Sequence, residues 1–382
     1  MARLGDVCTI VSGTTPKSSC PEYWDGDINW VTPAELDDES DVIYESQRKI
    51  TKQAVMDSSL KAFPAGTVLL SSRAPIGKVA IAGTEMYCNQ GFKNLICSDA
   101  IYNRYLYHFL KSKTEYLNSL GRGATFKEIS KSIVEEIKIP LPQMEEQRHI
   151  AALLDRVSNL IAKRRGQLDK LDLLVKARFV EMFEDPEENP RGYEKRKLGS
   201  LARKISDGVH AKPEYTETGR PFLSVVNINK GIINFEGCKF VSEEAYQKMI
   251  KSTHPERGDI LYTKVGATYG IPAYVDTDTE FCLYVSVCLI KPRHDEIDSK
   301  FLAISMSMPY IKCQADSRIK GIGVPDLHLN QINEFDILCP PRSEQEAFVG
   351  FVAHMDKSKL MIQQSLEKME TLKKALMQQY FG

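Results

Sequence analysis

The chain has 382 residues, of which 42% are hydrophobic and 26% are charged, as is typical of soluble globular proteins. The 50 basic and 51 acidic residues give a formal net charge of −1, which excludes a uniformly basic nucleic-acid-binding chain. No apolar run reaches the roughly 18 residues of a membrane span, and no signal-peptide core is present, so we expect a cytoplasmic protein. The 9 cysteines lack a C-x-x-C pair, which argues against a disulfide framework and a zinc ribbon.

Residues 1–141 predict a first globular domain that mixes α and β structure. The stretches "TVLLSS" (67–72) and "KVAIAG" (78–83) are short β-rich runs, bounded by glycine and proline. Residues 104–120 have the periodicity of a helix. Trp24 and Trp30 could stack on bases, but aromatic residues of this size more often pack in a core.

A long helix is predicted at 142–184. Prolines end the preceding strand because proline cannot continue a β-ladder, and Glu145 and Glu146 then suit the positive end of a helix dipole. Apolar residues recur every seven positions, the period of a coiled coil, at Leu154, Ile161, Leu168, Val175 and Met182. A helix of this size is about 60 Å long.

The second half of the chain repeats this order. A linker at 185–197 precedes a second domain at 198–339, with β-rich runs at 259–264 and 271–275 and a helix at 300–315 interrupted by Pro309. A second long helix is predicted at 340–382. Its apolar residues again recur every seven positions, at Phe348, Met355, Ile362, Met369 and Leu376.

The repeat is visible in the sequence itself. A shift of 198 superposes "IPLPQMEEQRHI" (139–150) on "ILCPPRSEQEAF" (337–348), and it sets Gln147 on Gln345. Such a long period indicates a duplicated domain. We therefore predict an α+β protein in which two similar mixed α/β domains are joined by two long helices. The helices form an antiparallel coiled coil with a pseudo-twofold internal repeat. The alternative is that each helix packs back on its own domain.

The whole pattern resembles the specificity (S) subunit of type I restriction–modification systems. The residues that carry the resemblance are "LGDVCTIVSGTTP", "EYWDGDINWVTPAEL", "LLSSRAPIGKVAI", "CNQGFKNL", "GRGATFKEIS" and the twice-written "IPLPQMEEQRHI" motif. The resemblance implies that each domain, as a target-recognition domain, reads one half of a split, asymmetric site in double-stranded DNA, and that the helices set the gap. It also implies partners, namely two methyltransferase subunits and motor–nuclease subunits. These would bind S-adenosylmethionine, ATP and Mg²⁺, while this chain would bind no cofactor.

Catalytic motifs are missing from the sequence. An adenine methyltransferase would carry Asn/Asp-Pro-Pro-Tyr/Phe, but "CPPR" (339–342) lacks both the Asn/Asp and the aromatic residue, and no phosphate-binding loop is present. No histidine or cysteine spacing predicts a metal site. We therefore expect a non-catalytic subunit. Three alternatives remain open: the specificity subunit of a related system without a motor, a methyltransferase in its own right, and a coiled-coil protein unrelated to DNA.

Candidate DNA-contact residues lie in glycine-containing loops at matching places in the two halves. Glycine lets a backbone approach phosphate closely, and arginine and lysine can neutralise phosphate or read guanine. The alternative for each is an ordinary solvated surface charge. The candidates are Arg73, Lys78, Arg122, Thr125, Lys127, Lys264, Tyr269, Arg318 and Lys320.

Overall fold

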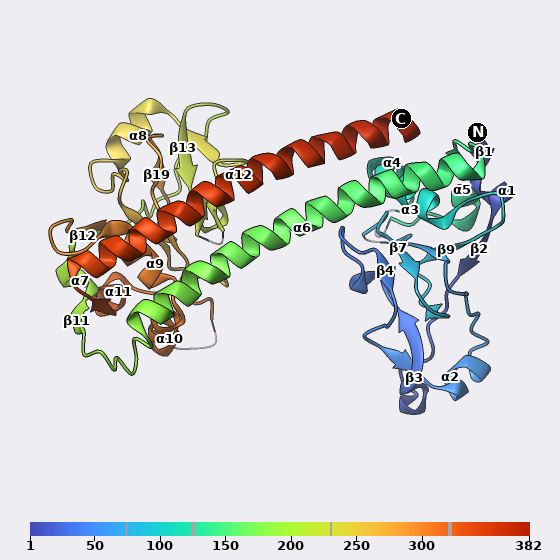
Figure 1. Ribbon diagram of the computed structural model, residues 1–382, viewed down its shortest axis with the longest axis horizontal. Coiled ribbons are helices and arrows are strands. Elements are labelled where there is room, and N and C mark those ends of the chain that lie inside the picture. The colour runs from blue at the N-terminus through green and yellow to red at the C-terminus, as the bar shows by residue number, and fades with distance from the viewer. Residues whose placement is uncertain (74, 124–126, 230, 320–322) are drawn as a thin grey trace. The chain divides into compact units, whose positions relative to one another are not determined.

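The computed structural model describes residues 1–73, 75–123, 127–229, 231–319 and 323–382 (Figure 1). The chain divides into two compact units, each of which we describe by itself. Unit 1 comprises residues 1–166 and 362–382, and unit 2 comprises residues 167–361. Each of the two long helices therefore contributes to both units.

Unit 1 contains two main sheets, and helices flank them. Its strands are β1 (Ala2–Arg3), β2 (Cys8–Ser12), β3 (Trp24–Val31), β4 (Val42–Ile43), β5 (Lys49–Ile50), β6 (Val68–Leu70), β7 (Val79–Ala82), β8 (Tyr87–Cys88), β9 (Lys93–Cys97) and β10 (Lys138–Ile139). Its helices are α1 (Leu4–Val7), α2 (Lys52–Asp57), α3 (Asn103–Ser112), α4 (Thr114–Leu120), α5 (Lys131–Glu136) and the first part of α6 (Met144–Phe183). The inner sheet has the order β2-β9-β6-β7-β4, and the outer sheet has the order β5-β3-β8.

Unit 2 repeats this plan. Its strands are β11 (Glu194–Lys197), β12 (Ala202–Asp207), β13 (Arg220–Leu223), β14 (Ile228–Asn229), β15 (Ile232–Ile233), β16 (Lys239–Val241), β17 (Ile260–Thr263), β18 (Pro272–Tyr274), β19 (Cys282–Leu283), β20 (Val287–Pro292) and β21 (Asp336–Cys339). Its helices are α7 (Leu198–Leu201), α8 (Glu243–Met249), α9 (Ser299–Met306), α10 (Pro309–Arg318), α11 (Leu329–Asn333), the second part of α6 and the first half of α12 (Arg342–Phe381). The inner sheet has the order β12-β20-β17-β18, and the outer sheet has the order β16-β13-β19.

The strand orders show that the two halves are equivalent element by element. β2, β9, β6 and β7 correspond to β12, β20, β17 and β18, and the outer sheets both pair their central strand antiparallel on one side and parallel on the other. The predicted fold class of two similar mixed α/β domains with long helices is therefore confirmed. The strands expected at 67–72, 78–83, 259–264 and 271–275 are β6, β7, β17 and β18.

Two local expectations were wrong. The helix predicted at 104–120 is broken at Lys113, whose backbone leaves the helical region at φ −106° and ψ 17°. The hydroxyls of Ser112 and Thr114 each donate to a backbone carbonyl one turn earlier, which competes with continuous helix at this point. The end of the predicted linker 185–197 instead forms β11, which pairs with β21.

Candidate nucleic-acid interface

In unit 1, a serine hydroxyl holds the loop between β6 and β7. Ser71 Oγ donates to the Pro75 carbonyl (2.6 Å) and accepts from the Lys78 N–H (2.9 Å). Gly77 adopts φ +89°, a conformation that favours glycine, and its N–H donates to the Ser71 carbonyl. The loop that carries Arg73 and Lys78 is thus fixed from inside.

Unit 2 builds the same loop with different residues. Thr263 Oγ1 donates to the Thr268 carbonyl (2.7 Å) and accepts from the Ile271 N–H (2.9 Å). Gly270 has φ +88° and donates its N–H to the Thr263 carbonyl (2.7 Å). Because the same hydrogen bonds recur at the equivalent hairpin, these loops are corresponding sites in the two halves.

A second loop lies against each hairpin. In unit 1, Arg122 and Glu128 exchange both backbone hydrogen bonds, and the Ile129 N–H donates to the Ser72 carbonyl (3.0 Å). In unit 2, the Leu327 N–H donates to the Lys264 carbonyl (2.9 Å). Residues 128–129 of unit 1 and residues 325–327 of unit 2 therefore adjoin the hairpin loops, whereas 124–126 and 320–322 lie outside the described residues.

In unit 1, a buried lysine links these two loops. Lys93 comes from β9, is 6% exposed, and donates from Nζ to Glu128 Oε1 (3.2 Å) and Ser72 Oγ (3.3 Å). Arg73 Nε donates to the other oxygen of the same carboxylate (2.8 Å). Burial works against the charged carboxylate, but the Arg73 and Lys93 bonds hold the pKa of Glu128 below its usual value. Lys93 was not among the predicted site residues, because nothing local in "GFKNL" distinguishes it from a surface lysine.

In unit 2, the predicted contact residue Lys264 plays this internal part. Its side chain is buried, and Nζ lies 3.5 Å from Oδ1 of both Asp207 and Asp326. Burial raises the pKa of Asp207, although the nearby ammonium opposes that effect. Since Asp326 and Glu128 are equivalent under the shift of 198, both halves hold their two loops with a buried lysine and a carboxylate. Because Lys264 is buried between these two carboxylates, we omit it from the proposed contact set.

The remaining predicted contact residues differ in exposure and in the partners that they have within the protein. Arg122 and Lys127 are exposed and Lys78 is half-buried, whereas Thr125 and Lys320 lie outside the described residues. Tyr269 donates from Oη to the Asp316 carboxylate, and Lys312 Nζ lies 3.4 Å from the Tyr269 ring centroid. Arg318 donates to the carbonyls of Gln314 and Glu334. The polar groups of Tyr269 and Arg318 are thus hydrogen-bonded within unit 2.

The repeated "EQ" motif explains how each domain joins its helix. Gln147 is 1% exposed. Its amide donates to the carbonyls of Pro142 (2.9 Å) and Ala100 (3.0 Å) and accepts from the Tyr102 N–H (2.9 Å). Gln345 does the same in unit 2 with the Pro340 carbonyl (2.8 Å) and the Asp298 N–H (2.9 Å). Each glutamine therefore ties the first turn of a long helix to the start of α3 or α9.

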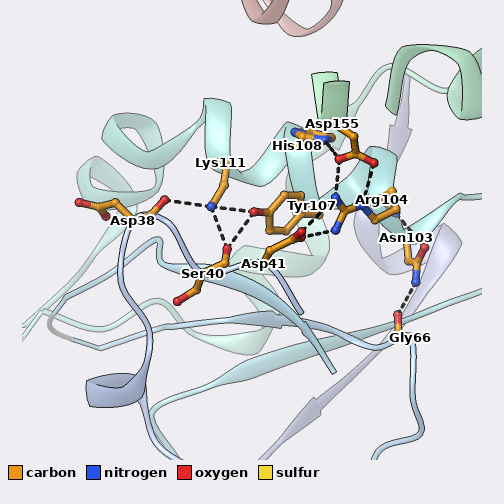
Figure 2. Close-up of polar contacts among 10 residues, drawn as sticks. All are labelled: Asp38, Ser40, Asp41, Gly66, Asn103, Arg104, Tyr107, His108, Lys111 and Asp155. Atoms are coloured by element: carbon orange, nitrogen blue, oxygen red, sulfur yellow. Dashed lines mark hydrogen bonds and ion pairs between the residues drawn. The ribbon is translucent and has the colours of Figure 1, made fainter. Parts of the chain in front are cut away.

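A polar cluster fixes α3 of unit 1 between the 38–41 segment and α6 (Figure 2). Arg104 bonds Asp41 and Asp155, and His108 Nε2 lies 2.7 Å from Asp155 Oδ1. Burial lowers the pKa of His108, although Asp155 opposes the shift. Lys111 Nζ donates to the Ser40 carbonyl (2.9 Å), and burial lowers its pKa to about 8.

The two long helices pair antiparallel within unit 2. Lys359 of α12 lies 2.5 Å from Asp172 of α6, whereas Phe348, earlier in α12, packs at 5.6 Å on Phe179 and Phe183, later in α6. The seven-residue positions are buried at Leu154, Ile161, Val175 and Phe348, and half-buried at Leu168, Met182, Met355, Ile362, Met369 and Leu376. The aromatic residues Phe179 and Phe183 lie off the predicted seven-residue series and carry much of the packing.

Two negative observations hold for the described parts of the chain. No group of three or more His, Cys, Asp or Glu side chains there could hold a metal ion. None of the helices found there combines the length and apolar character that crossing a membrane requires.

Comparison with known proteins identifies the class to which this architecture belongs. The model of the type I restriction modification DNA specificity domain matches residues 1–172 and again residues 190–371. The two matches cover most of the chain and follow its internal repeat, so the chain belongs to this family.

Individual relatives agree with the family match. The type I restriction enzyme MjaIX specificity subunit of Methanocaldococcus jannaschii is 30% identical over 401 residues, which cover 98% of this chain and 90% of the relative. The MjaVIII specificity subunit of the same organism is 25% identical over 99% of this chain and 90% of the relative. The crystal structure of a type I restriction–modification S subunit from M. genitalium shares the fold at a TM-score of 0.56. It is 17% identical and covers 100% of this chain and 95% of its own.

Proposed function

We propose that this specificity subunit reads a bipartite, asymmetric DNA site, one half with each domain, and that the paired helices set the gap. The observation that carries the proposal is the pair of equivalent loop sites. Both halves build the hairpin loop with the same hydrogen bonds, yet they present Arg73 and Lys78 in one half and Val265 and Ile271 in the other. Two loops with the same backbone hydrogen bonds but different side chains are suited to reading two different half-sites.

The helices offer surfaces on which partner proteins could dock. Large apolar side chains are exposed on α6 and α12 even though the helices also pack on each other, namely Leu160, Leu173, Leu174, Val180, Leu360, Met361 and Leu372. We assign these surfaces to two methyltransferase subunits, with motor–nuclease subunits joining the complex. S-adenosylmethionine, ATP and Mg²⁺ then belong to those partners, and this chain acts without catalysis of its own in the cytoplasm, where the DNA is.

The proposal is tested by mapping N6-methyladenine across the genome in cells with and without this chain. The expected result is methylation that depends on the chain and lies in two short, different sequences separated by a constant gap. An uninterrupted palindromic motif would contradict the assignment of one half-site to each domain. A second assay incubates the purified chain alone with S-adenosylmethionine and DNA, and we expect no methyl transfer.

A further inference from the structure

The outer sheet of each domain carries an exposed cation that the proposed loop sites do not include. In unit 1, Arg48 directly precedes β5, and its carbonyl accepts a hydrogen bond from the Trp30 N–H (3.3 Å), which places Arg48 opposite Trp30. In unit 2, the strand register sets Lys239 opposite Phe222. Trp30 and Phe222 are themselves equivalent, because each pairs with the first residue of the parallel neighbour, β8 or β19. Arg48 and Lys239 thus occupy the same position in the two halves.

Each cation lies on an aromatic ring. The Arg48 guanidinium carbon is 3.9 Å from the centroid of Trp24 and 5.4 Å from that of Trp30. The Lys239 ammonium is 4.3 Å from the centroid of Tyr215. Contact of this kind attracts the cation to the ring face and restricts the side chain before any ligand arrives.

The indoles under Arg48 are themselves fixed. Trp30 is 2% exposed, and its Nε1–H donates to the Thr14 carbonyl (3.1 Å). Trp24 is half-buried, packs edge-on against Trp30 at 5.1 Å, and donates its Nε1–H to the Lys17 carbonyl. Core packing was the expected role of both tryptophans, and the structure adds that they form a rigid platform for an arginine.

Arg48 contacts aromatic rings but forms no ion pair among the residues that the structure describes. Residues 1–143 contain five arginines, and three of them, Arg3, Arg73 and Arg104, form ion pairs with carboxylates. Within the described ranges, no carboxylate pairs with Arg48. A guanidinium that stacks by its face keeps its N–H edge available, and that edge matches O6 and N7 of guanine.

We propose that Arg48 recognises one guanine in the half-site read by the first domain, and that Lys239 is its counterpart in the second half-site. This inference rests on the proposed function. The two residues differ in consequence, because the planar fork of arginine can bond guanine twice whereas lysine acts as a point charge. Arg48 then selects a base at its position, and Lys239 contributes affinity with little selection.

The test measures the binding affinity of the complete complex, with methyltransferase subunits, for a set of DNA duplexes. Together the duplexes carry every base substitution in the site established by the methylation map. Arg48→Lys keeps the charge and removes the fork. We expect it to lower the preference for guanine at one position of one half-site by roughly 5- to 150-fold, the range for loss of one bidentate pair. Lys239→Ala should weaken binding to all duplexes and reduce the salt slope by about 1, with the base preferences of both half-sites unchanged.

Arg3→Lys is the matched control, because Arg3 is an exposed arginine of the same unit whose guanidinium is bound by Asp6 and Glu136. It should leave every base preference unchanged. Equal unfolding curves for wild type and Arg48→Lys establish that the fold is intact.

Three results would overturn the inference. A uniform loss of affinity for Arg48→Lys on all duplexes would make Arg48 a phosphate contact, and unchanged preferences would remove it from the interface. In both cases, a normal bipartite map for the wild type would leave the proposed function standing. Failure of the wild-type complex to methylate any bipartite site would overturn the proposed function and the inference together.

Discussion

At the scale of single residues, the sequence predicts the positions of the candidate DNA-contact loops. It predicts less well which side chains in those loops have partners within the protein. Glycines and adjacent polar residues predicted the hairpin loops, and these loops form. Lys264 has the same local features as a surface lysine, but Asp207 and Asp326, far away in sequence, enclose it. Arg48 shows the opposite case. What distinguishes it is its contact with the Trp24 ring, and the sequence does not show that contact because it depends on the pairing of β3 with β5.

The first residue-scale prediction concerns Gln147. Gln147→Ala leaves two carbonyls and the Tyr102 N–H of unit 1 without their buried partner, so it should lower the free energy of unfolding by about 3 kcal/mol. Urea denaturation measures the change. The exposed neighbour Gln143 is the control, and Gln143→Ala should shift stability by less than about 0.5 kcal/mol.

A second residue-scale prediction concerns acid stability. Because burial holds the pKa of His108 below its usual value, the unfolded chain binds this proton first as pH falls. The stability contributed by neutral His108 is therefore complete above about pH 6.5 and is lost as pH falls toward the folded pKa, at no more than about 1.4 kcal/mol per pH unit. His108→Gln should flatten the dependence between pH 7 and pH 5, measured by urea unfolding. An unchanged slope in the variant would contradict the assignment.

At the scale of elements, the long helices were predictable because many residues report on them at once. Prolines, first-turn acids and a sustained apolar period all indicate helices close to the observed Met144–Phe183 and Arg342–Phe381. Short elements depend on fewer residues, so hydroxyl groups beside Lys113 suffice to split a predicted helix. Phe179 and Phe183, at the end of α6, were missed because they lie off the seven-residue series, although their partner Phe348 lies on it.

The element-scale prediction concerns that cluster. Phe179 is fully buried and packs on Phe183, Phe301 and Phe348, so Phe179→Ala should cost about 3–5 kcal/mol of unfolding free energy in unit 2. Val180 is the adjacent control, because its side chain is 48% exposed. Val180→Ala should be nearly neutral in the same denaturation experiment, and equal losses in the two variants would refute the assigned packing.

At the scale of the whole molecule, the duplication was predictable because the two halves keep similar motifs in the same order. The predicted antiparallel pairing implies that the end of α12 lies beside the start of α6, and residues 362–382 do belong to the same compact unit as residues 1–166. What could not be predicted is which side chains make that contact, such as Phe381 on Tyr105 and Phe109. These contacts join segments that local patterns do not connect. Neither the sequence nor the fold identifies the recognised bases, because recognition depends on contacts between side chains and nucleotides.

The whole-molecule prediction concerns the gap. Removing one heptad from each long helix, residues 166–172 and 361–367, keeps the apolar period and shortens the pair by about 10 Å. The preferred gap in the methylation map should shorten by roughly 3 base pairs at about 3.4 Å per base pair. The two half-site sequences should stay the same. An unaltered gap in a stable variant would refute the role of the helices as a spacer.

The packing of Phe381 has a consequence for synthesis of the protein. This residue is 2% exposed, and its ring packs edge-on against Tyr105 and Phe109 of α3 at 5.2 and 5.7 Å. On the ribosome, residues 1–166 precede residues 362–382 by roughly 10–40 s of translation, at about 5–20 residues per second. During that interval Tyr105 and Phe109 lack the cover of Phe381, although the rest of α3 can already pack in the core of residues 1–166. The first recognition domain to be made is thus the last to be finished, and a prematurely terminated chain carries an exposed aromatic surface that chaperones and proteases can detect.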